Sequence, residues 1–242
     1  MSMIKTAKKV TDLEADASQK LLHVLDCEPA MTMAAIFNTM RILKRVNPGD
    51  AYYENYLSMR ARYGAKFFDT YQLLWGIGVY LAPKRILEIG VRTGISLCQL
   101  LSAHKDLRAI ERIVCVDPFD QWTSASIVRA NLKHLNLPHT PEHVEILAMK
   151  SEDYYPTAIQ NEDTFDYVLV DGDHTKEVAR KDLDYVHQLV EHGGVIVFDD
   201  ISTAPGECAL IDVWEAWKTE HLDEYVFTEV MEGKGVAIAV KI

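Results

Sequence analysis

The sequence has few cysteines and no paired-cysteine motif. Cys27, Cys98, Cys115 and Cys208 are scattered, and no C-x-x-C pair occurs among them. Cys98 and Cys115 lie in apolar segments, where a small thiol is typical of a core side chain. The sequence therefore indicates no disulfide framework, and its unpaired thiols predict a reduced, cytoplasmic protein.

Long apolar runs and basic clusters are also missing. No run of 18 apolar residues occurs and the N-terminus has no apolar leader segment, so we predict neither a membrane span nor a signal peptide. The formal net charge is -11, and lysines and arginines form only short pairs such as Lys8-Lys9. This acidic balance argues against nucleic acid and anionic membranes as partners. With 242 residues, 48% of them hydrophobic, the chain can form one sizeable core.

The dinucleotide-binding pattern G-x-G-x-x-G is absent too. In its place the segment 85–96 reads RILEIGVRTGIS, in which Glu88 precedes Gly90 and Gly94. The apolar residues before Gly90 predict a short buried strand, and the two glycines predict a tight turn into a helix N-terminus. Because an acid accompanies this turn, we expect a ligand that carries an ammonium group and no phosphate.

Strands and helices alternate from residue 83 to the end of the chain. Apolar runs predict strands before Gly90 and at 112–117, 144–147, 165–171, 195–198, 224–232 and 235–241. Helical spacing predicts helices at 95–107, 124–135, 175–191 and 209–221, and His192-Gly193-Gly194 is the expected end of the third. This order predicts a doubly wound, Rossmann-like α/β fold with a mostly parallel sheet and one antiparallel strand from a terminal hairpin.

The first 82 residues are predicted to form a helical extension to a main domain at 83–242. Helical spacing indicates helices at 11–26, 30–46, 50–62 and 65–81, with Pro29 breaking the first. The extension is rich in methionine and aromatic residues. We favour packing against the sheet or against a second subunit, which would make the protein a homodimer or a higher homo-oligomer. The alternative is a lid over the substrate.

Several predicted strands end in carboxylates: Glu88, Asp117, Asp171 and the pair Asp199-Asp200. Ligands of an open α/β sheet bind at the carboxyl ends of its strands, so we expect these acids to meet at one edge. Helix capping is the alternative role for any one of them. Asp117 is expected to accept hydrogen bonds from two ribose hydroxyls, and Glu88 to face an ammonium group directly or through water.

The segment that follows strand 144–147 falls where this fold holds adenine. Ser151 and the backbone around Met149 and Lys150 are the expected contacts. Phe119 or Trp122 could flank the base, and ordinary loop packing is the alternative for both aromatic residues.

Asp171, Asp199 and Asp200 are predicted to share a divalent cation. Three carboxylates that converge without a basic neighbour repel one another, and the nearest basic residues, Lys176 and Arg180, belong to the next helix. Mg²⁺ prefers such oxygen ligands. Adjacent strand residues point to opposite faces, so Asp199 and Asp200 can share an ion only where their strand has ended.

The segments FDYVLVDGDH at 165–174 and GGVIVFDD at 193–200, with Lys181-Asp182-Leu183 between them, resemble metal-dependent small-molecule O-methyltransferases. These are class I S-adenosylmethionine-dependent enzymes, and the likeness is to the macrocin O-methyltransferase and cephalosporin-hydroxylase-like branch. It extends from about residue 85 to 241. It implies S-adenosylmethionine and Mg²⁺ as cofactors and a sugar hydroxyl as acceptor. The implied cofactor residues are Glu88, Gly90, Gly94, Asp117, Ser151 and Asp171, and the implied metal ligands are Asp171, Asp199 and Asp200.

The same resemblance places a catalytic base at Asp173 or His174. Coordination to Mg²⁺ lowers the pKa of an alcohol, and a nearby base then takes its proton. A helix N-terminus and a cation would keep His174 neutral, which makes it the favoured base. A plain place in the first helical turn is the alternative. Two further functions remain open: a methyltransferase for a catechol or an N-nucleophile, and a non-catalytic S-adenosylmethionine-binding interaction protein.

Overall fold

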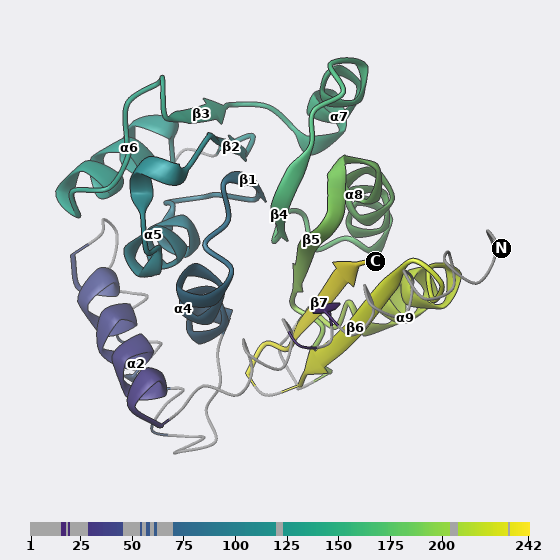
Figure 1. Cartoon of the computed structure of the whole chain (residues 1–242), viewed down its shortest axis with the longest axis horizontal. Coiled ribbons are helices and arrows are strands. Elements are labelled where there is room, and N and C mark those ends of the chain that lie inside the picture. The colour runs from purple at the N-terminus through teal and green to yellow at the C-terminus, as the bar shows by residue number, and fades with distance from the viewer. Residues whose placement is uncertain are drawn as a thin grey trace, which may run out of the picture.

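The fold is built on a seven-stranded sheet with the order β3-β2-β1-β4-β5-β7-β6 (Figure 1). We describe it from a computed structural model, which covers residues 16, 17, 19, 29–45, 54, 57, 58, 61, 70–119, 123–203, 208–231 and 233–242. The strands are β1 (Arg85–Ile89), β2 (Arg112–Val116), β3 (Val144–Leu147), β4 (Phe165–Val170), β5 (Val190–Asp199), β6 (Tyr225–Val230) and β7 (Val236–Lys241). Strand β7 runs antiparallel to β5 and β6, and the four other neighbouring pairs are parallel. The predicted doubly wound sheet with a terminal hairpin is therefore confirmed.

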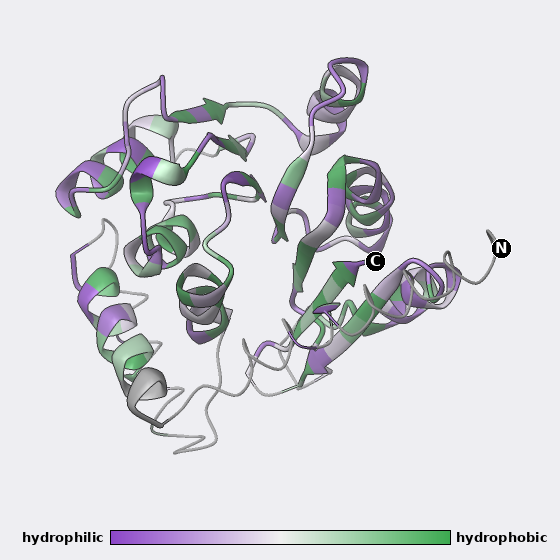
Figure 2. Ribbon diagram, viewed as in Figure 1, coloured by the Kyte–Doolittle hydropathy of each residue, from purple (hydrophilic) through white to green (hydrophobic). Residues whose placement is uncertain are grey.

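Helices cover both faces of the sheet, because each strand supplies apolar side chains to both. On β1, for example, Ile86 belongs to one apolar layer and Leu87 to the other. The first layer receives α2 (Pro29–Leu43), α4 (Thr70–Tyr80), α5 (Ile95–Ala103) and α6 (Ala125–His134). The second receives α7 (Ser151–Gln160), α8 (Lys176–Leu189) and α9 (Ile211–Glu220). In Figure 2 these helices carry both hydrophobic and hydrophilic residues, as a helix between a core and solvent requires.

In the second half of the chain, the predicted end of one helix is wrong and one helix was not predicted. Helix α8 ends at Leu189, and β5 already begins at Val190, so the glycines at 193 and 194 lie within a strand and do not cap the helix. The pairing of β4 with β5 shifts register between Phe165 and Tyr167, and this irregularity accommodates the extra residues of β5 around the two glycines. Helix α7 is absent from the predicted elements because it contains Pro156, a residue that normally ends a helical pattern.

Two helices of the first half end earlier than predicted, and one of them is α2, which ends at Leu43 instead of residue 46. Helix α5 ends at Ala103, and a 3₁₀ turn at Leu107–Ala109 follows. Helix α2 begins at Pro29, next to the predicted start at residue 30, and there the missing N–H of proline has no partner to lose. The helices predicted at 11–26 and 50–62 lie mostly outside the described residues. In the described part of the chain, no helix has the length and apolar character needed to cross a membrane.

The described part of the extension packs on the sheet domain through α5. Ile42 and Leu43 of α2 and Leu73 and Leu74 of α4 join the first apolar layer. Polar contacts add to this packing: Gln99 of α5 accepts a hydrogen bond from Asn38 (2.8 Å) and donates to Thr39 (3.0 Å) and to the carbonyl of Tyr71 (3.0 Å). The described residues of the extension therefore pack on helix α5 of the sheet domain, and the lid and oligomer roles stay predictions.

Candidate functional site

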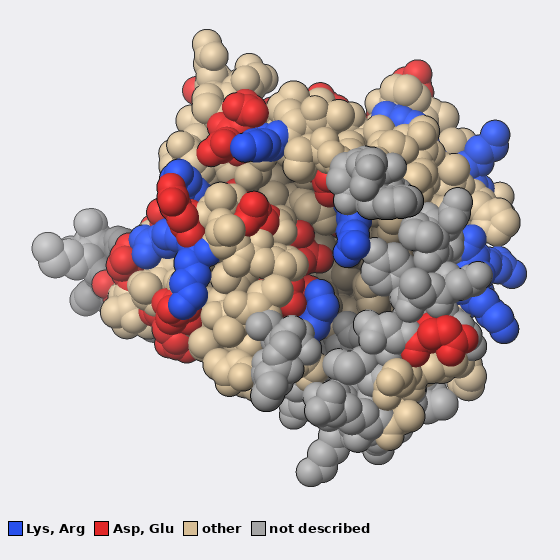
Figure 3. Space-filling model, turned by 180° about the vertical axis from the view of Figure 1, so that it is seen from behind, with Lys and Arg blue, Asp and Glu red and all other residues tan. Residues whose placement is uncertain are grey.

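A cavity of about 710 Å³ lies at the carboxyl ends of β1, β2, β4 and β5. Most sequence-predicted site residues line it: Gly90, Asp117, Ser151, Asp171, Asp173, His174 and Asp199. Its volume is in the range of sites that hold a small molecule or a cofactor. Figure 3 shows a hollow on one face of the molecule that is bordered by acidic and basic side chains. The sheet therefore brings together residues that are far apart in the sequence.

The turn between β1 and α5 requires its two glycines. Gly90 has φ +87°, and a Cβ atom there would lie 1.8 Å from the carbonyl oxygen of Asp171. Gly94 has φ +77°, and its Cβ would lie 2.9 Å from Cγ1 of Val128. The turn therefore approaches the end of β4 so closely that no side chain fits at residue 90.

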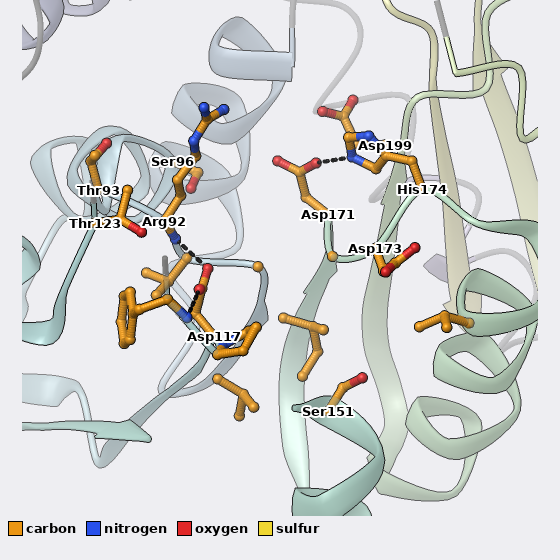
Figure 4. Close-up of a pocket in the computed structure, with 18 of the residues that line it drawn as sticks. Arg92, Thr93, Ser96, Asp117, Thr123, Ser151, Asp171, Asp173, His174 and Asp199 are labelled. Atoms are coloured by element: carbon orange, nitrogen blue, oxygen red, sulfur yellow. Dashed lines mark hydrogen bonds and ion pairs between the residues drawn. The ribbon is translucent and has the colours of Figure 1, made fainter. Parts of the chain in front are cut away.

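Asp117 is fixed at the end of β2 by two backbone donors. Its carboxylate accepts hydrogen bonds from the N–H groups of Arg92 and Phe119, each at 2.7 Å (Figure 4). Arg92 belongs to the glycine turn, so this bond ties β2 to that turn. A carboxylate has about four acceptor positions, and those left over can accept ligand hydroxyls.

Glu88 does not line the cavity, and this disagrees with a direct contact between Glu88 and a ligand, which is one of the two predicted arrangements. Its side chain is buried and accepts a hydrogen bond from the hydroxyl of Ser96, which does line the cavity. Burial, assisted by the negative charges of Asp171 and Asp117, raises the pKa of Glu88 to about 8. Any effect of Glu88 on a ligand must therefore pass through Ser96 or a water molecule.

The expected adenine side of the cavity is formed by the start of α7. Ser151 lines the cavity, and its hydroxyl bonds Asp182, a buried acid that also accepts a hydrogen bond from Tyr155 at 2.9 Å. The first turn of a helix leaves backbone N–H groups free to donate to a base. Phe119 lines the cavity as well, whereas Trp122 lies outside the described residues.

The three predicted metal ligands do converge. Asp171, Asp199 and Asp200 each place a carboxylate oxygen within 4.8 Å of the other two. Asp199 ends β5, and Asp200 takes a left-handed conformation with φ +64°, so the strand has ended where the sequence argument required. Asp199 and Asp200 are buried. Burial and the charge of Asp171 raise the pKa of Asp199 well above its usual range.

The prediction that these acids lack a basic partner is wrong. Lys234, in the loop between β6 and β7, places its Nζ 3.4 Å from Asp200 and 3.9 Å from Asp199. Burial opposes the charge of Lys234, but the three carboxylates outweigh this and raise its pKa. Thr70, from α4, also donates a hydrogen bond to Asp199 at 2.6 Å. One lysine leaves the three acids with excess negative charge, so the donor set still suits a divalent cation.

The two candidate bases differ in their surroundings. Asp173 accepts a hydrogen bond from the N–H of Thr175 (2.7 Å), and this bond lowers the pKa of Asp173, which makes it a weaker base. Nε2 of His174 lies 3.1 Å from Asp200 and 3.6 Å from Asp171, on the wall opposite Asp117 (Figure 4). The contact with Asp171 and the negative charge of Asp200 raise the pKa of His174. These acidic neighbours act in the opposite direction to the helix N-terminus and the cation that were expected to keep His174 neutral, and its role as the base stays a prediction.

Residues 87–201 match a family that is described as a methyltransferase domain. These residues form a methyltransferase domain. Within the O-methyltransferase branch, the chain is 26% identical over 124 residues to "Probable caffeoyl-CoA O-methyltransferase 3" of Dictyostelium discoideum. These residues are 50% of this chain and 45% of that protein, so the chain spans about half the length of the curated relative it matches.

Solved structures share the fold of this methyltransferase domain. An O-methyltransferase from Bacillus cereus, in complex with SAH, has a TM-score of 0.55 at 17% identity and covers 95% of this chain and 100% of its own. TomG from Streptomyces achromogenes, an O-methyltransferase involved in tomaymycin synthesis and in complex with SAM, has a TM-score of 0.56 at 19% identity and covers 76% and 86%. The predicted class I fold is confirmed. The macrocin and cephalosporin-hydroxylase likeness, the domain boundary and the residue roles stay predictions.

The buried acid of the methyltransferase domain leads to a pH prediction. In the unfolded chain Glu88 has its usual pKa of 4.5, whereas in the folded chain its pKa is about 8. Between these two pH values, Glu88 is therefore protonated only in the folded chain. Its contribution to stability is therefore complete below about pH 4.5 and is lost as the pH rises toward 8. We expect the wild type to lose about 2–4 kcal/mol relative to Glu88→Gln between pH 5 and pH 8.

Urea unfolding of both proteins at pH 5, 6.5 and 8 measures this difference. Glu111→Gln is the matched control, because Glu111 is exposed. Equal pH dependence of the wild type and Glu88→Gln would show that Glu88 is ionised in the folded chain.

Proposed function

We propose that this chain transfers a methyl group from S-adenosylmethionine to a hydroxyl group of a small molecule, with Mg²⁺ or another divalent cation. The observation that carries this proposal is the single cavity that joins the glycine turn and Asp117 to the cluster of Asp171, Asp199 and His174. The match to a methyltransferase domain and the O-methyltransferase relatives support the same reaction. Two of the similar solved structures hold SAH or SAM, which supports the choice of donor.

Each wall of the cavity has a task in this proposal. Asp117 would bind the ribose hydroxyls of the donor, and the start of α7 would bind its adenine. Asp171, Asp199 and Asp200 would hold the cation, which when bound lowers the pKa of the acceptor hydroxyl. Methyl transfer from a sulfonium is an in-line displacement, so the main contribution of the two walls is to hold donor and acceptor close and aligned.

His174 is the proposed base, and Asp173 is set aside because its carboxylate is held at the start of α8. The side chain of His174 is 42% exposed and lines the cavity, so it can reach an acceptor. It accepts a proton only when its imidazole is neutral. In the reaction the acceptor oxygen forms a bond to the methyl carbon, the bond from that carbon to sulfur breaks, and the hydroxyl proton passes to His174.

The acceptor stays open between a sugar or glycosylated natural product, a catechol and an N-nucleophile. Activity on candidate acceptors with and without EDTA distinguishes a metal-assisted hydroxyl acceptor from an N-nucleophile. A protein that binds S-adenosylhomocysteine but methylates no acceptor would instead support a non-catalytic binding role.

Asp117→Ala tests how the donor is bound. We expect S-adenosylhomocysteine to bind the wild type in a one-to-one complex, and the variant about 30–100-fold more weakly, because hydrogen bonds to a charged group contribute about 2–3 kcal/mol. Calorimetric titration measures both affinities.

Asp153→Ala is the matched control for this titration, because Asp153 lies exposed on α7 and does not line the cavity. Equal affinities for Asp117→Ala and the wild type would remove Asp117 from the donor site. A folded wild type that binds no S-adenosylhomocysteine would contradict the proposed function as a whole.

A further inference from the structure

A further group of side chains that could hold a metal ion lies away from the cavity. His187, His221 and Glu224 each offer one ligand atom, and these atoms lie within 4.8 Å of one another. None of the three residues lines the cavity. His187 belongs to the last turn of α8, His221 directly follows α9, and Glu224 directly precedes β6. Three elements thus converge on one point.

The carboxylate of Glu224 joins the two imidazoles. Its Oε1 lies 2.8 Å from Nδ1 of His221, and its Oε2 lies 3.8 Å from Nε2 of His187. The two rings lie close, with centroids 4.4 Å apart. Ligand atoms of one tetrahedral zinc ion lie about 3.4 Å apart, so small side-chain rotations would bring these three donors around one ion.

The surroundings hold the donors in place. Nδ1 of His187 lies 3.0 Å from the hydroxyl of the buried Tyr225, which leaves Nε2 to face Glu224. A hydrogen bond on the second ring nitrogen is the usual way in which proteins orient a histidine ligand. The ring of His221 packs on the buried Trp217, with centroids 4.6 Å apart.

The backbone of this cluster is fixed as well. The N–H of Glu224 donates to the carbonyl of His221 at 3.0 Å, and the carbonyl of Glu224 accepts from the N–H of Ile242 at 2.9 Å. The histidine side chains are only 21% and 16% exposed, whereas that of Glu224 is 48% exposed. The cluster is therefore anchored on one side and open to water on the other.

We propose that His187, His221 and Glu224 form a binding site for a transition-metal ion of the Zn²⁺ class, separate from the methyltransferase cavity. Two imidazole nitrogens and one carboxylate suit Zn²⁺, Co²⁺ or Ni²⁺, whereas Mg²⁺ prefers oxygen ligands alone. Water completes the coordination on the open side. An ion bound there links the ends of α8 and α9 to the edge strand β6.

Zinc titration of the full-length protein tests this site. The protein is first treated with EDTA and dialysed, and ZnCl₂ binding is then measured by calorimetry in an Asp200→Asn background, because Asp200 belongs to both groups of possible metal ligands at the cavity, Asp171/Asp199/Asp200 and His174/Asp200/Cys208. We expect one ion per chain, with affinity at least 10-fold weaker after His187→Ala or His221→Ala. His192→Ala is the matched control, because His192 is exposed and bonds only the carbonyl of Ile242 among the described residues.

A second measurement guards against variants that do not fold. Co²⁺ bound to the unmodified protein should show visible absorption bands typical of nitrogen coordination, and Glu224→Gln, which keeps the side-chain shape, should change them. Zinc affinity that is unchanged in both histidine variants, or no zinc binding below about 100 μM in the folded wild type, would overturn the proposal. Either result leaves the proposed methyltransferase function untouched, because no residue is shared.

Discussion

Gly90→Ala is expected to abolish S-adenosylhomocysteine binding and to lower the free energy of unfolding by about 3 kcal/mol or more. Two effects combine at this position. The backbone has φ +87°, which a residue with a Cβ rarely adopts, and the new Cβ would lie 1.8 Å from the carbonyl oxygen of Asp171. That oxygen belongs to the backbone at the end of β4, so the clash is relieved only if the turn or the strand end moves. Thermal or urea unfolding and calorimetric titration measure the two effects.

Gly94→Ala is the control for this experiment. Its φ of +77° imposes a similar backbone strain, but the nearest atom to its Cβ is a methyl group of Val128, at 2.9 Å, which is a longer contact than that at Gly90 and involves a side chain, not the backbone. We expect a cost of about 1–2 kcal/mol, clearly less than that of Gly90→Ala. Equal costs would show that strain alone, and not the contact with Asp171, accounts for the loss.

Asp199→Asn is expected to lower methyl transfer at least 100-fold while S-adenosylhomocysteine binding changes less than about 3-fold. The amide has the shape of the carboxylate and still accepts the hydrogen bond from Thr70. It removes one negative charge from the three that would hold the cation, and the affinity for Mg²⁺ falls with it. Asp117 and the glycine turn, which would bind the donor, are left intact. Steady-state rates at several Mg²⁺ concentrations measure the effect, and unchanged turnover would exclude a metal role for Asp199.

Lys234→Gln separates a metal site from a structural ion pair. If Asp199 and Asp200 hold a cation, removal of the lysine should tighten Mg²⁺ binding, because a competing positive charge is gone. If the acids serve only to pair with Lys234, the variant should lose stability and bind no Mg²⁺. Calorimetric titration with Mg²⁺ and thermal unfolding, both without substrate, distinguish the two.

Most of the sheet could be predicted because its strands are locally encoded. Buried parallel strands are short apolar runs, so β1 to β4 agree with their patterns within about one residue. The glycine turn was recognisable for the same reason, since two glycines follow such a run. Helix ends were harder to predict. Helix α8 ends at Leu189 because Val190 pairs with Phe165 on β4, a contact between distant segments that no local pattern records.

The candidate site was predicted to the extent that its residues end strands. Asp117, Asp171 and Asp199 could be placed at one edge because parallel strands bring their carboxyl ends together. Glu88 shows the limit of this reasoning. It ends a strand pattern like the others, but its side chain is buried behind Ser96, and the face to which a strand residue points depends on the register of the whole sheet.

By itself the sequence determined the order of strands and helices, the glycine turn and the set of acids, because each follows from apolar periodicity or from residue type at a strand end. Only the tertiary structure decided which groups face those acids. Lys234 lies 35 residues after Asp199 in the sequence and Thr70 lies 129 residues before it, and both contact Asp199 in the fold. His187 likewise meets His221 and Glu224 only when α8 packs beside the segment that joins α9 to β6. Such neighbours determine the charge and the pKa of a site, and they arise from long-range packing that no short stretch of sequence encodes.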